Sequence, residues 1–574
     1  MKRIFISVVA TLALTIAAVS PAKAQDPKPD FGGTMINNDI ATWLDLYDMS
    51  FTSHNFGTAR SMAMGNAFTA LGADMVSSSL NPAGVGMYVG GDFSFSPMMS
   101  FSKSRTEGGD PYYSSFDYGW FDDHTERFAI PSFGVVSPIY MGTGGVTNIN
   151  FGISYNRIAD FNQERLMASY DNDVVNSMAN YFCELANANR GDFIFDDDSG
   201  RLLFGDPHFW GSVLAYKNGL INVDDQGWFI DRIGTNALVD HYSAVQTKGS
   251  LGEWAFTAGF NIVDKLYLGI SLGIQDLNYK RRTYSGENYH YGEGEQPNIS
   301  DKPLDYEMQY ANYIQNTRYS GAGHNFKIGV TARPFNWLRI GVAYHTPTYY
   351  SIDLSYSAEM NSETFSAGDN PDGYTGIGPN GYFEDYVESP LWEDYGAYSW
   401  DFRSPSRLLT GVALTIGRRA IISVDYERSW YQTIRLQDSP IEQLDVIYKQ
   451  NYKDIFKGSN TLRLGAELYI LPAVALRAGY IWSGKTLRSD YEHAIFTRPI
   501  PTEQSLLTAG FGLHLNKTTT LDFAYQYGQT HYTAEQIFYV TETVGGITEP
   551  VIESAVFNTK TDRHHAVVTI GFRF

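Results

Sequence analysis

The last nine residues of the chain, Ala566–Phe574, read AVVTIGFRF, and this stretch decides the fold. Counted back from the end, every second residue is apolar, whereas the residues between them include Arg573, Gly571 and Thr569. A two-residue period predicts a β-strand with one apolar and one mixed face. A strand of an ordinary β-sandwich has the same pattern, so the choice of architecture depends on the rest of the chain.

The alternation returns about fourteen times along the sequence. The alternating segments lie near residues 90–105, 128–140, 146–158, 252–262, 265–283, 320–333, 336–357, 399–416, 419–435, 458–470, 473–488, 503–515, 518–535 and 560–574. Short turns such as 263–265 and 471–472 alternate with long polar loops, notably 159–251, 284–319 and 358–398. This asymmetry, together with a final strand that ends in Phe, is typical of bacterial outer-membrane barrels.

A sheet in lipid must close on itself, because lipid offers its backbone no hydrogen-bond partners. Residues 90–574 are therefore predicted to form an all-β, transmembrane, antiparallel β-barrel of about 14 strands. Apolar residues between Leu166 and Leu185 recur at helical spacing, so helical segments are expected in the extracellular loops. Such a helix either packs against other loops or presents its apolar stripe to a ligand.

The composition agrees with a barrel and excludes several classes of function. Aromatic residues make up 15% of the 574 residues, as in barrels with aromatic girdles, and the net charge of −21 argues against a nucleic-acid partner. The single cysteine, Cys183, excludes an internal disulfide and a thiolate zinc site. Because no catalytic motif is found, we expect no enzyme activity, metal or cofactor. His564 and His565 are neighbours on a strand and face opposite ways, so they cannot jointly bind a haem iron.

The N-terminus has the pattern of a secretory signal peptide. Lys2 and Arg3 precede an apolar core, Ile4–Val19, and a small-residue site ends at Ala24. Residues 1–24 are therefore predicted to be cleaved, with the mature protein exported to the outer membrane of a Gram-negative cell. The acidic residues Asp192 and Asp196–Asp198 lack calcium-loop spacing, which favours a solvated loop over a calcium site.

Residues 25–89 lack the alternation and are predicted to fold into the lumen as a plug. Glycine weakens a strand unless another segment must approach closely, and glycines recur on the predicted inner face. These glycines are Gly152, Gly259, Gly269, Gly273, Gly329, Gly341, Gly411, Gly465, Gly479, Gly510, Gly512 and Gly571. Charges of both signs share that face, which favours ion pairs that brace wall and plug over an ionic path for a charged solute.

The box Arg60–Asp74, followed by Asn81-Pro82-Ala83-Gly84, resembles the N-terminal hatch of FadL-type outer-membrane transporters. This family comprises long-chain fatty-acid and aromatic-hydrocarbon channels. The strand segments 337–347 and 471–480 also look like the family. In architecture the resemblance covers the whole mature chain, whereas in specific motifs it covers the hatch and several strands. Loop 159–251 departs from the family by its size.

The resemblance implies passive uptake of fatty-acid-like or aromatic small molecules, gated by the hatch, with release through a gap at a kinked third strand. The counterpart of that strand is 146–158, where Asn150 and Gly152 would allow a bend. The candidate ligand-binding and gating residues, for which ordinary plug packing is the alternative, are Phe51, Phe56, Met62, Met64, Phe68, Asn81, Pro82, Ala83 and Met87. The expected partners are a hydrophobic ligand, outer-membrane lipid and lipopolysaccharide, and the expected state is a monomer.

Two other functions remain open at this point. A plugged barrel of this family also serves as a cargo-handling subunit in type nine secretion, and the very large loops would suit protein contacts. Co-purified protein partners would favour that alternative. An outer-membrane lipase or protease would need a serine or acidic catalytic site, which the sequence does not show.

Overall fold

The computed structural model describes residues 43–51, 55–109, 117–142, 145–188, 210–292, 298–299, 302–303, 306–366, 380–388, 398–417, 419–437, 444–492, 496, 498–544 and 547–574. The predicted signal peptide, residues 25–42 of the predicted plug, and the acidic cluster Asp192 and Asp196–Asp198 lie outside the described residues.

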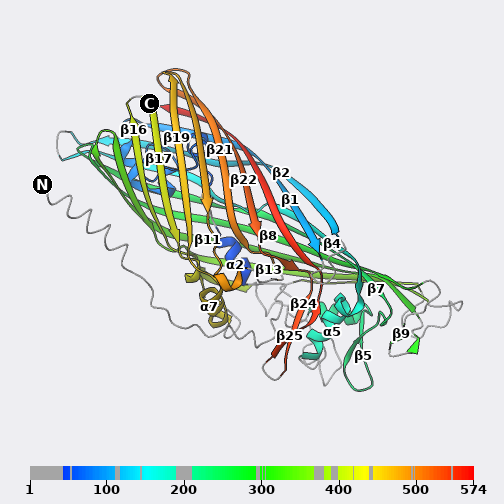
Figure 1. The fold of residues 1–574 in the computed structure, drawn as a ribbon. Coiled ribbons are helices and arrows are strands. Elements are labelled where there is room, and N and C mark those ends of the chain that lie inside the picture. The colour runs from blue at the N-terminus through cyan, green and yellow to red at the C-terminus, as the bar shows by residue number, and fades with distance from the viewer. Residues whose placement is uncertain are drawn as a thin grey trace.

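Fourteen wall strands close into an antiparallel barrel, as the sequence predicted (Figure 1). In ring order they are β1 (Asp92–Gly109), β2 (Asp117–Tyr140), β3 (Val146–Asp160), β7 (Leu238–Ile262), β8 (Leu266–His290), β11 (Tyr306–Phe335), β12 (Leu338–His345) with β13 (Tyr349–Ser366), β16 (Arg407–Ile416) with β15 (Tyr398–Arg403), β17 (Ala420–Ser429) with β18 (Arg435–Gln437), β19 (Ser459–Leu471), β20 (Val474–Ser483), β21 (Pro501–His514), β22 (Thr519–Tyr532) and β26 (Val556–Arg573). The C-terminal strand closes the ring, because β26 pairs with β1 at Phe93↔Phe572 and Met98↔Val567.

The outward face of the wall is an apolar belt. Exposed large apolar side chains follow one another around the ring and include Phe151, Phe256, Ile270, Ile328, Val412, Val424, Leu468, Leu476, Leu507 and Ile570. On β19, Leu464 and Leu468 are exposed, whereas Arg463 and Glu467, which directly precede them, are buried in the lumen. A closed sheet with this arrangement satisfies its backbone internally and offers an apolar surface to hydrocarbon.

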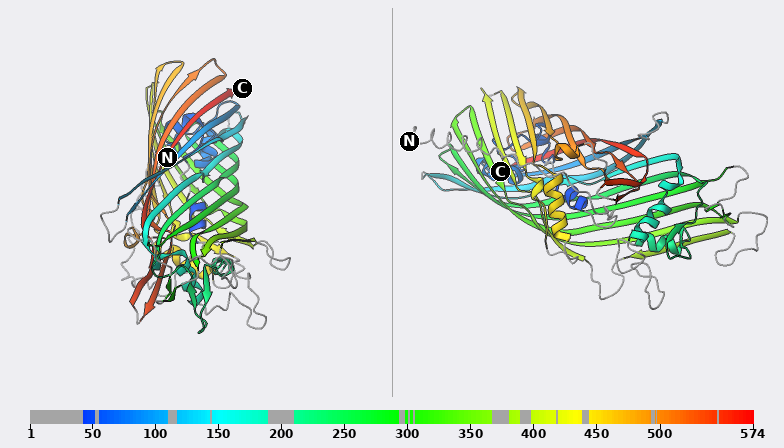
Figure 2. Two further views of the ribbon diagram at one scale, coloured as in Figure 1. Left: turned by 90° about the vertical axis from the view of Figure 1, so that its right-hand side faces the viewer. Right: turned by 60° about the horizontal axis from the view of Figure 1, so that its bottom comes forward.

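The wall is much taller on one side than on the other. Strands β7 and β8 are 25 residues long and β11 is 30, whereas β20 has 10. The green strands therefore extend well past the yellow ones in Figures 1 and 2. We call this end, which carries the long connections, the loop end, and the opposite end, with turns such as 263–265, the turn end.

These extensions correct the predicted loop bounds. Parts of 159–251 and 284–319 are wall strand, since β7 begins at Leu238 and β11 at Tyr306. The part of 358–398 up to Ser366 also continues β13. Beyond the belt the outward face meets water, so the apolar row moves to the inward face, where Leu277 and Tyr279 are buried. The alternation then continues with polar residues facing outward and apolar residues facing inward. In the sequence, the polar residues give these strand segments the composition of a loop.

Further elements fold over the mouth of the barrel at the loop end. They are β4 (Gln163–Asp173), η2 (Val174–Asn176), α5 (Met178–Ala188), α6 (Trp210–Lys217), β5 (Ile221–Val223), β6 (Phe229–Asp231), η4 (Tyr431–Thr433), α7 (Leu444–Ile455), η5 (Ser489–Tyr491), β23 (Glu535–Gln536), β24 (Tyr539–Val544) and β25 (Ile547–Glu553). Smaller strands are β9 (Asn298–Ile299), β10 (Lys302–Pro303) and β14 (Asn380–Glu388).

Helices are present in the long connections, as predicted, but the helix expected from Leu166 begins only at Met178. Leu166, Met167 and Tyr170 belong to strand β4, which pairs with β7. Pairing with an already extended neighbour overrides the helical spacing there.

No helix in the described parts of the chain is both long and apolar enough to cross a lipid bilayer.

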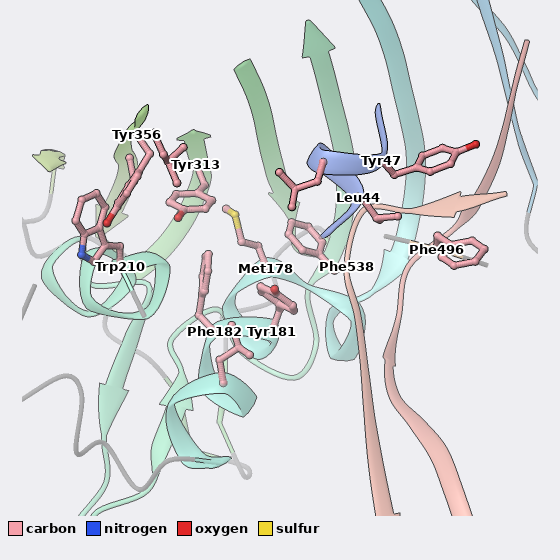
Figure 3. Close-up of a cluster of buried hydrophobic side chains, with 14 of the residues drawn as sticks. Leu44, Tyr47, Met178, Tyr181, Phe182, Trp210, Tyr313, Tyr356, Phe496 and Phe538 are labelled. Atoms are coloured by element: carbon pink, nitrogen blue, oxygen red, sulfur yellow. The ribbon is translucent and has the colours of Figure 1, made fainter. Parts of the chain in front are cut away.

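A large aromatic cluster fills the mouth (Figure 3). Phe182 of α5 meets Tyr313 of the wall edge-on at 5.3 Å between ring centroids, and Tyr181 lies 5.3 Å from Phe538. Trp210 of α6 packs at 5.0 Å from the ring of Tyr356. The apolar stripe of α5 is therefore used in packing, which was one of the two roles predicted for it.

A buried carboxyl group ties α5 to the wall beyond the apolar belt. Glu287 of β8 accepts hydrogen bonds of 2.6 Å from the Met178 amide and from the Tyr289 hydroxyl, and His241 Nε2 lies 3.2 Å away. Burial raises the pKa of Glu287 to about 8, although both hydrogen bonds oppose the shift. Burial also lowers the pKa of His241 to about 4. Both groups are therefore neutral near pH 7.

This pair makes the stability of the mouth depend on pH. A carboxyl group whose folded pKa is raised contributes stability that is lost as pH rises towards that folded pKa. Between pH 6.5 and 8 both groups are partly titrated, so the slope stays below the full value for one proton, and we expect the opening free energy of α5 to fall by roughly 0.6–1 kcal/mol per pH unit. Hydrogen exchange, corrected for intrinsic rates, measures this change. Glu287→Gln should remove it, and an unchanged slope in that variant would contradict the assignment.

Candidate functional site

The N-terminal segment from Asn55 to Tyr88 lies inside the barrel, against the wall glycines. It contains α3 (Ala59–Ala63), α4 (Ser77–Leu80) and η1 (Pro82–Met87). Wall glycines at which an added Cβ would meet plug atoms closer than 3 Å are Gly259, Gly269, Gly329, Gly341, Gly411, Gly465, Gly479 and Gly510. Figure 1 shows this segment in blue within the ring of strands. The plug backbone approaches the wall this closely only because these positions lack side chains.

Three of these glycines form a row under η1. Gly269 pairs with Gly259 on one side and with Gly329 on the other, so the row crosses three neighbouring strands. A Cβ on Gly269 would lie 2.1 Å from the carbonyl carbon of Pro82 and 2.2 Å from the Ala83 amide nitrogen. The predicted hatch residues Pro82 and Ala83 therefore rest directly on the wall.

Asn81 fixes the start of η1. Its side-chain amide donates to the Thr69 carbonyl at 2.6 Å and to Thr331 Oγ1 of β11 at 3.1 Å, and its Oδ1 accepts from the Ala83 amide at 3.1 Å. On β3, Asn150 donates to the carbonyl oxygens of Val85 and Tyr88 at 2.7 and 2.8 Å. Both asparagines thus hold the plug to the wall.

Ion pairs brace the lumen, in agreement with one of the two predicted roles for the inward charges. Arg60 of the plug pairs with Glu467 at 3.0 Å, and Glu467 also pairs with Arg477 at 2.6 Å. Arg477 continues to Asp522 at 2.6 Å. A second group joins Lys327 to Glu253. Buried charges are tolerated only when they are paired in this way.

A cavity of about 110 Å³ lies between the plug and the mouth cluster. The predicted ligand residues Phe51 and Phe56 line it from the plug side, and Phe56 meets His565 of β26 edge-on at 5.2 Å. Other lining residues are Asn55, Phe161, Gln163, Tyr279, Gln504, Thr530 and Tyr532. His565 faces this cavity, whereas His564 is bound to Tyr525 on the exposed side, as strand geometry predicted.

The cavity combines aromatic walls with a few directed polar groups. Phe161 and Tyr279 meet edge-on at 5.3 Å. Gln163 accepts from the Tyr532 hydroxyl at 2.8 Å, and Gln504 accepts from Asn55 at 3.2 Å. Such a lining suits a compact, mainly apolar ligand that is oriented by a small number of hydrogen bonds.

A charged collar separates this cavity from the mouth. Helix α2 (Trp43–Ser50) places Asp45 within hydrogen-bond reach of Arg281, at 3.1 Å, and of Arg498. Asp48, one turn along, pairs with Arg498 at 2.8 Å and lines the cavity. Burial raises the pKa of Asp48 to about 6, while the charge of Arg498 opposes the shift. The collar therefore offers a ligand a region of balanced charge.

The other predicted residues lie away from the cavity. Met62, Met64 and Phe68 are fully buried and pack plug against wall. Met87 lies beside Gly72 within the plug. Gly152 pairs with both neighbours, as Val136↔Gly152 and Gly152↔Thr257, so the wall is continuous there. Pairing between β2 and β3 ends at Ser132↔Asn156, nearer the loop end.

Sequence reasoning did not single out Arg498, Tyr279, Gln163 or Tyr532, although all line the cavity. They come from four distant parts of the chain, and none belongs to a motif. From the sequence, only the inward-facing positions of Tyr279 and Tyr532 on their strands could have been recognised. Many other residues of the barrel also occupy inward-facing positions.

Comparison with known proteins gives structural similarity without sequence similarity. No protein-family model matches the chain, and no curated protein matches it. The chain is similar to a Pseudomonas aeruginosa FadL homologue, at 10% identity and a TM-score of 0.46 over 91% of this chain and 98% of the other.

It is also similar to two toluene transporters. TodX of P. putida matches at 11% identity and a TM-score of 0.44, and TbuX of Ralstonia pickettii at 12% and 0.42, each over 91% of this chain and 99% of the other. The FadL-type resemblance in the sequence is thus found again among solved structures. At these TM-scores the fold assignment rests on this chain's own strand pairing.

Proposed function

We propose that the protein is a channel for passive uptake of small hydrophobic molecules across the outer membrane. The observation that carries the proposal is the aromatic cavity directly above a plug that fills the lumen. The loop end faces outward in this proposal, so a solute enters through the mouth and reaches the cavity past the charged collar. The similar structures include toluene transporters, which supports the same class of solute.

The size of the cavity favours a one-ring aromatic molecule. An engineered apolar cavity of about 150 Å³ accepts benzene, and the cavity here measures about 110 Å³. Phe51, Phe56 and Phe161 supply ring faces and edges for such a ligand. A longer, fatty-acid-like chain would require the plug or the collar to move.

Passage beyond the cavity requires a movement of the plug, which acts as a hatch in this proposal. Its hydrogen bonds through Asn81 and Asn150, and the ion pair between Arg60 and Glu467, are among the contacts that must be exchanged. Lateral release at β3 remains our proposal, and the place where β2 and β3 part, after Ser132↔Asn156, is the most favourable point for it. At Asn150 and Gly152 the pairing itself would have to open.

Toluene binding tests the cavity. Phe56→Ala should weaken binding of toluene to the purified protein by about two- to tenfold, because an aromatic contact contributes roughly 0.5–1.5 kcal/mol. Titration calorimetry in detergent gives the affinity. Phe326→Ala removes a ring of the outward belt, where 44% of the side chain is exposed, and should leave binding unchanged. Equal loss in both variants, or none in Phe56→Ala, would refute this site.

The alternative role in secretion rests on the size of the loops. In the described residues most apolar side chains of the mouth elements are buried against each other and against the wall, whereas Val175, Trp228, Val446 and Ile447 are exposed. This packing gives the mouth elements a structural role, which agrees better with the transport proposal than with a role in protein binding. Stable co-purification of a protein cargo, with no toluene binding, would reverse the preference.

A further inference from the structure

A cationic cluster lies on the outward surface of the tall side of the barrel, beyond the apolar belt. It consists of Lys248 on β7, Lys280 and Arg282 on β8, and Arg318 on β11, all of them exposed. With neighbouring polar residues they line a hollow of about 370 Å³. The four cations face away from the lumen and are not part of the cavity or the collar, although the collar residue Arg281 also lines this hollow.

The strand register forces these charges together. Lys280 pairs directly with Lys248 on one side and with Arg318 on the other, so three cations stand side by side on three strands. Arg282 occupies the next outward row, between Gln246 and Asn316. Like charges directly opposite each other destabilise a sheet. An anion bound beside this row would offset the repulsion.

The described part of the protein does not supply that anion. None of the four cations makes an ion pair with a described residue. Of the acidic groups on the neighbouring strands, Glu164 accepts a hydrogen bond of 2.8 Å from Gln246, and Asp353 lies one row nearer the belt, opposite Ser320. The chain as a whole carries a net charge of −21, so this concentration of positive charge is local.

The position of the cluster identifies the kind of anion. The last large apolar residues of the belt on these strands are Trp254 and Ile274. Lys248 and Lys280 lie six residues farther along their strands. At about 3.3 Å per residue and a strand tilt of about 40°, this places the cations roughly 15 Å outside the hydrocarbon. In the proposed orientation, that is the sugar and phosphate layer of the outer leaflet.

We propose that this cluster binds the phosphorylated, carboxylated core saccharide of an outer-leaflet glycolipid, that is, lipopolysaccharide. Arginine and lysine donate charge-assisted hydrogen bonds to phosphate and carboxylate oxygens. Tyr284 lies two residues beyond Arg282 on the same face and offers a ring beside the charges for a sugar to pack on. The inference rests on the proposed membrane orientation and adds a fixed lipid site on the tall side of the wall.

Native mass spectrometry of the detergent-solubilised protein, titrated with rough-type lipopolysaccharide, tests the site. Lys280→Gln combined with Arg318→Gln should lower the affinity for lipopolysaccharide about tenfold or more, since each basic residue near an anionic lipid surface strengthens the binding. Enzymatic removal of the lipid's phosphates should weaken binding to the unaltered protein, and inorganic phosphate alone should not compete at equal concentration. Lys449→Gln with Lys453→Gln, two exposed lysines of α7, is the matched control and should bind as the unaltered protein does.

Thermal unfolding provides a second reading of the same variant. Without lipid, the double Gln variant should unfold at a higher temperature than the unaltered protein, because the cross-strand repulsion is gone. Addition of lipopolysaccharide should raise the unfolding temperature of the variant by less than that of the unaltered protein. Equal affinity in both proteins, or equal binding of dephosphorylated lipid, would overturn the proposal. So would preferential binding of an acidic protein at this face. Toluene binding in the lumen should be unchanged in the variant. Failure of the lipid-site proposal therefore leaves the transport proposal standing, and failure of toluene binding leaves the lipid-site proposal standing.

Discussion

Replacing Leu464 with arginine is expected to destabilise the barrel by roughly 2–4 kcal/mol, the cost of a cation on the lipid face near the bilayer midplane. Leu464 lies midway along β19, and 38% of its side chain is exposed on the outward face. Its strand neighbours Val424 and Tyr480 lie in the middle parts of β17 and β20. Urea unfolding of the protein in lipid vesicles, followed by heat-modifiable migration, measures the loss.

Ile470→Arg is the matched control on the same strand. Ile470 is 52% exposed on the same outward face and lies one residue before β19 ends at Leu471, where an arginine reaches water. The cost of a charge on the lipid face falls to about 0–1 kcal/mol near the interface. Equal costs at Leu464 and Ile470 would show that depth does not matter, and hence that this face does not lie in a hydrocarbon layer.

Gly269→Ala is expected to displace the plug. The new methyl group would meet backbone atoms of Pro82 and Ala83 at 2.1 to 2.3 Å, and backbone atoms cannot rotate away as side chains do. Overpacking of this kind costs about 1–3 kcal/mol. Because the cost applies only while the plug is seated, the unseated population should rise roughly 5- to 150-fold. Single-channel conductance in a planar bilayer should then show more frequent or longer openings.

Gly152→Ala makes the same chemical change at a wall glycine with more room. A Cβ there would lie 3.2 Å from a Val136 methyl and 3.5 Å from a Val85 methyl, both movable side-chain atoms. Its conductance should match that of the unaltered protein. If the channel of the Gly269→Ala variant also remains closed, and its residues 82–87 are as protected from hydrogen exchange as in the unaltered protein, then the plug is not seated on the glycine row.

The barrel itself could be predicted from the sequence because strand pairing and membrane burial impose the same period. Within the belt, each residue faces either hydrocarbon or the lumen, so outward positions are mostly apolar and inward positions admit polar residues, as Leu464, Leu468 and Glu467 show. Inward Met98 and Val567 are apolar because they pack against the plug. The same alternation placed the glycines on the inward face, because a residue's odd or even position along a strand decides which face it occupies. Their prediction as the seat of the plug followed from that placement. Beyond the belt the rule fails, and β7, β8 and β11 are longer than the predicted strands.

The cavity was only partly predictable. Phe51 and Phe56 line it, whereas Met62, Met64 and Phe68 of the Arg60–Asp74 box pack against the wall. The difference between these roles depends on how the plug turns inside the ring, which no local pattern encodes. Arg498 reaches Asp48 from 450 residues away in the chain, so their pairing follows from closure of the barrel.

The sequence by itself determined the closed sheet, its strand number, its apolar belt and the segment inside it, because hydrocarbon on one face and a packed lumen on the other constrain every second residue. Only the tertiary structure decided where the cavity lies, which plug residues reach it, and that Lys248, Lys280 and Arg318 stand in one row. Those features depend on strand register and on contacts between distant segments, which residue periodicity does not specify.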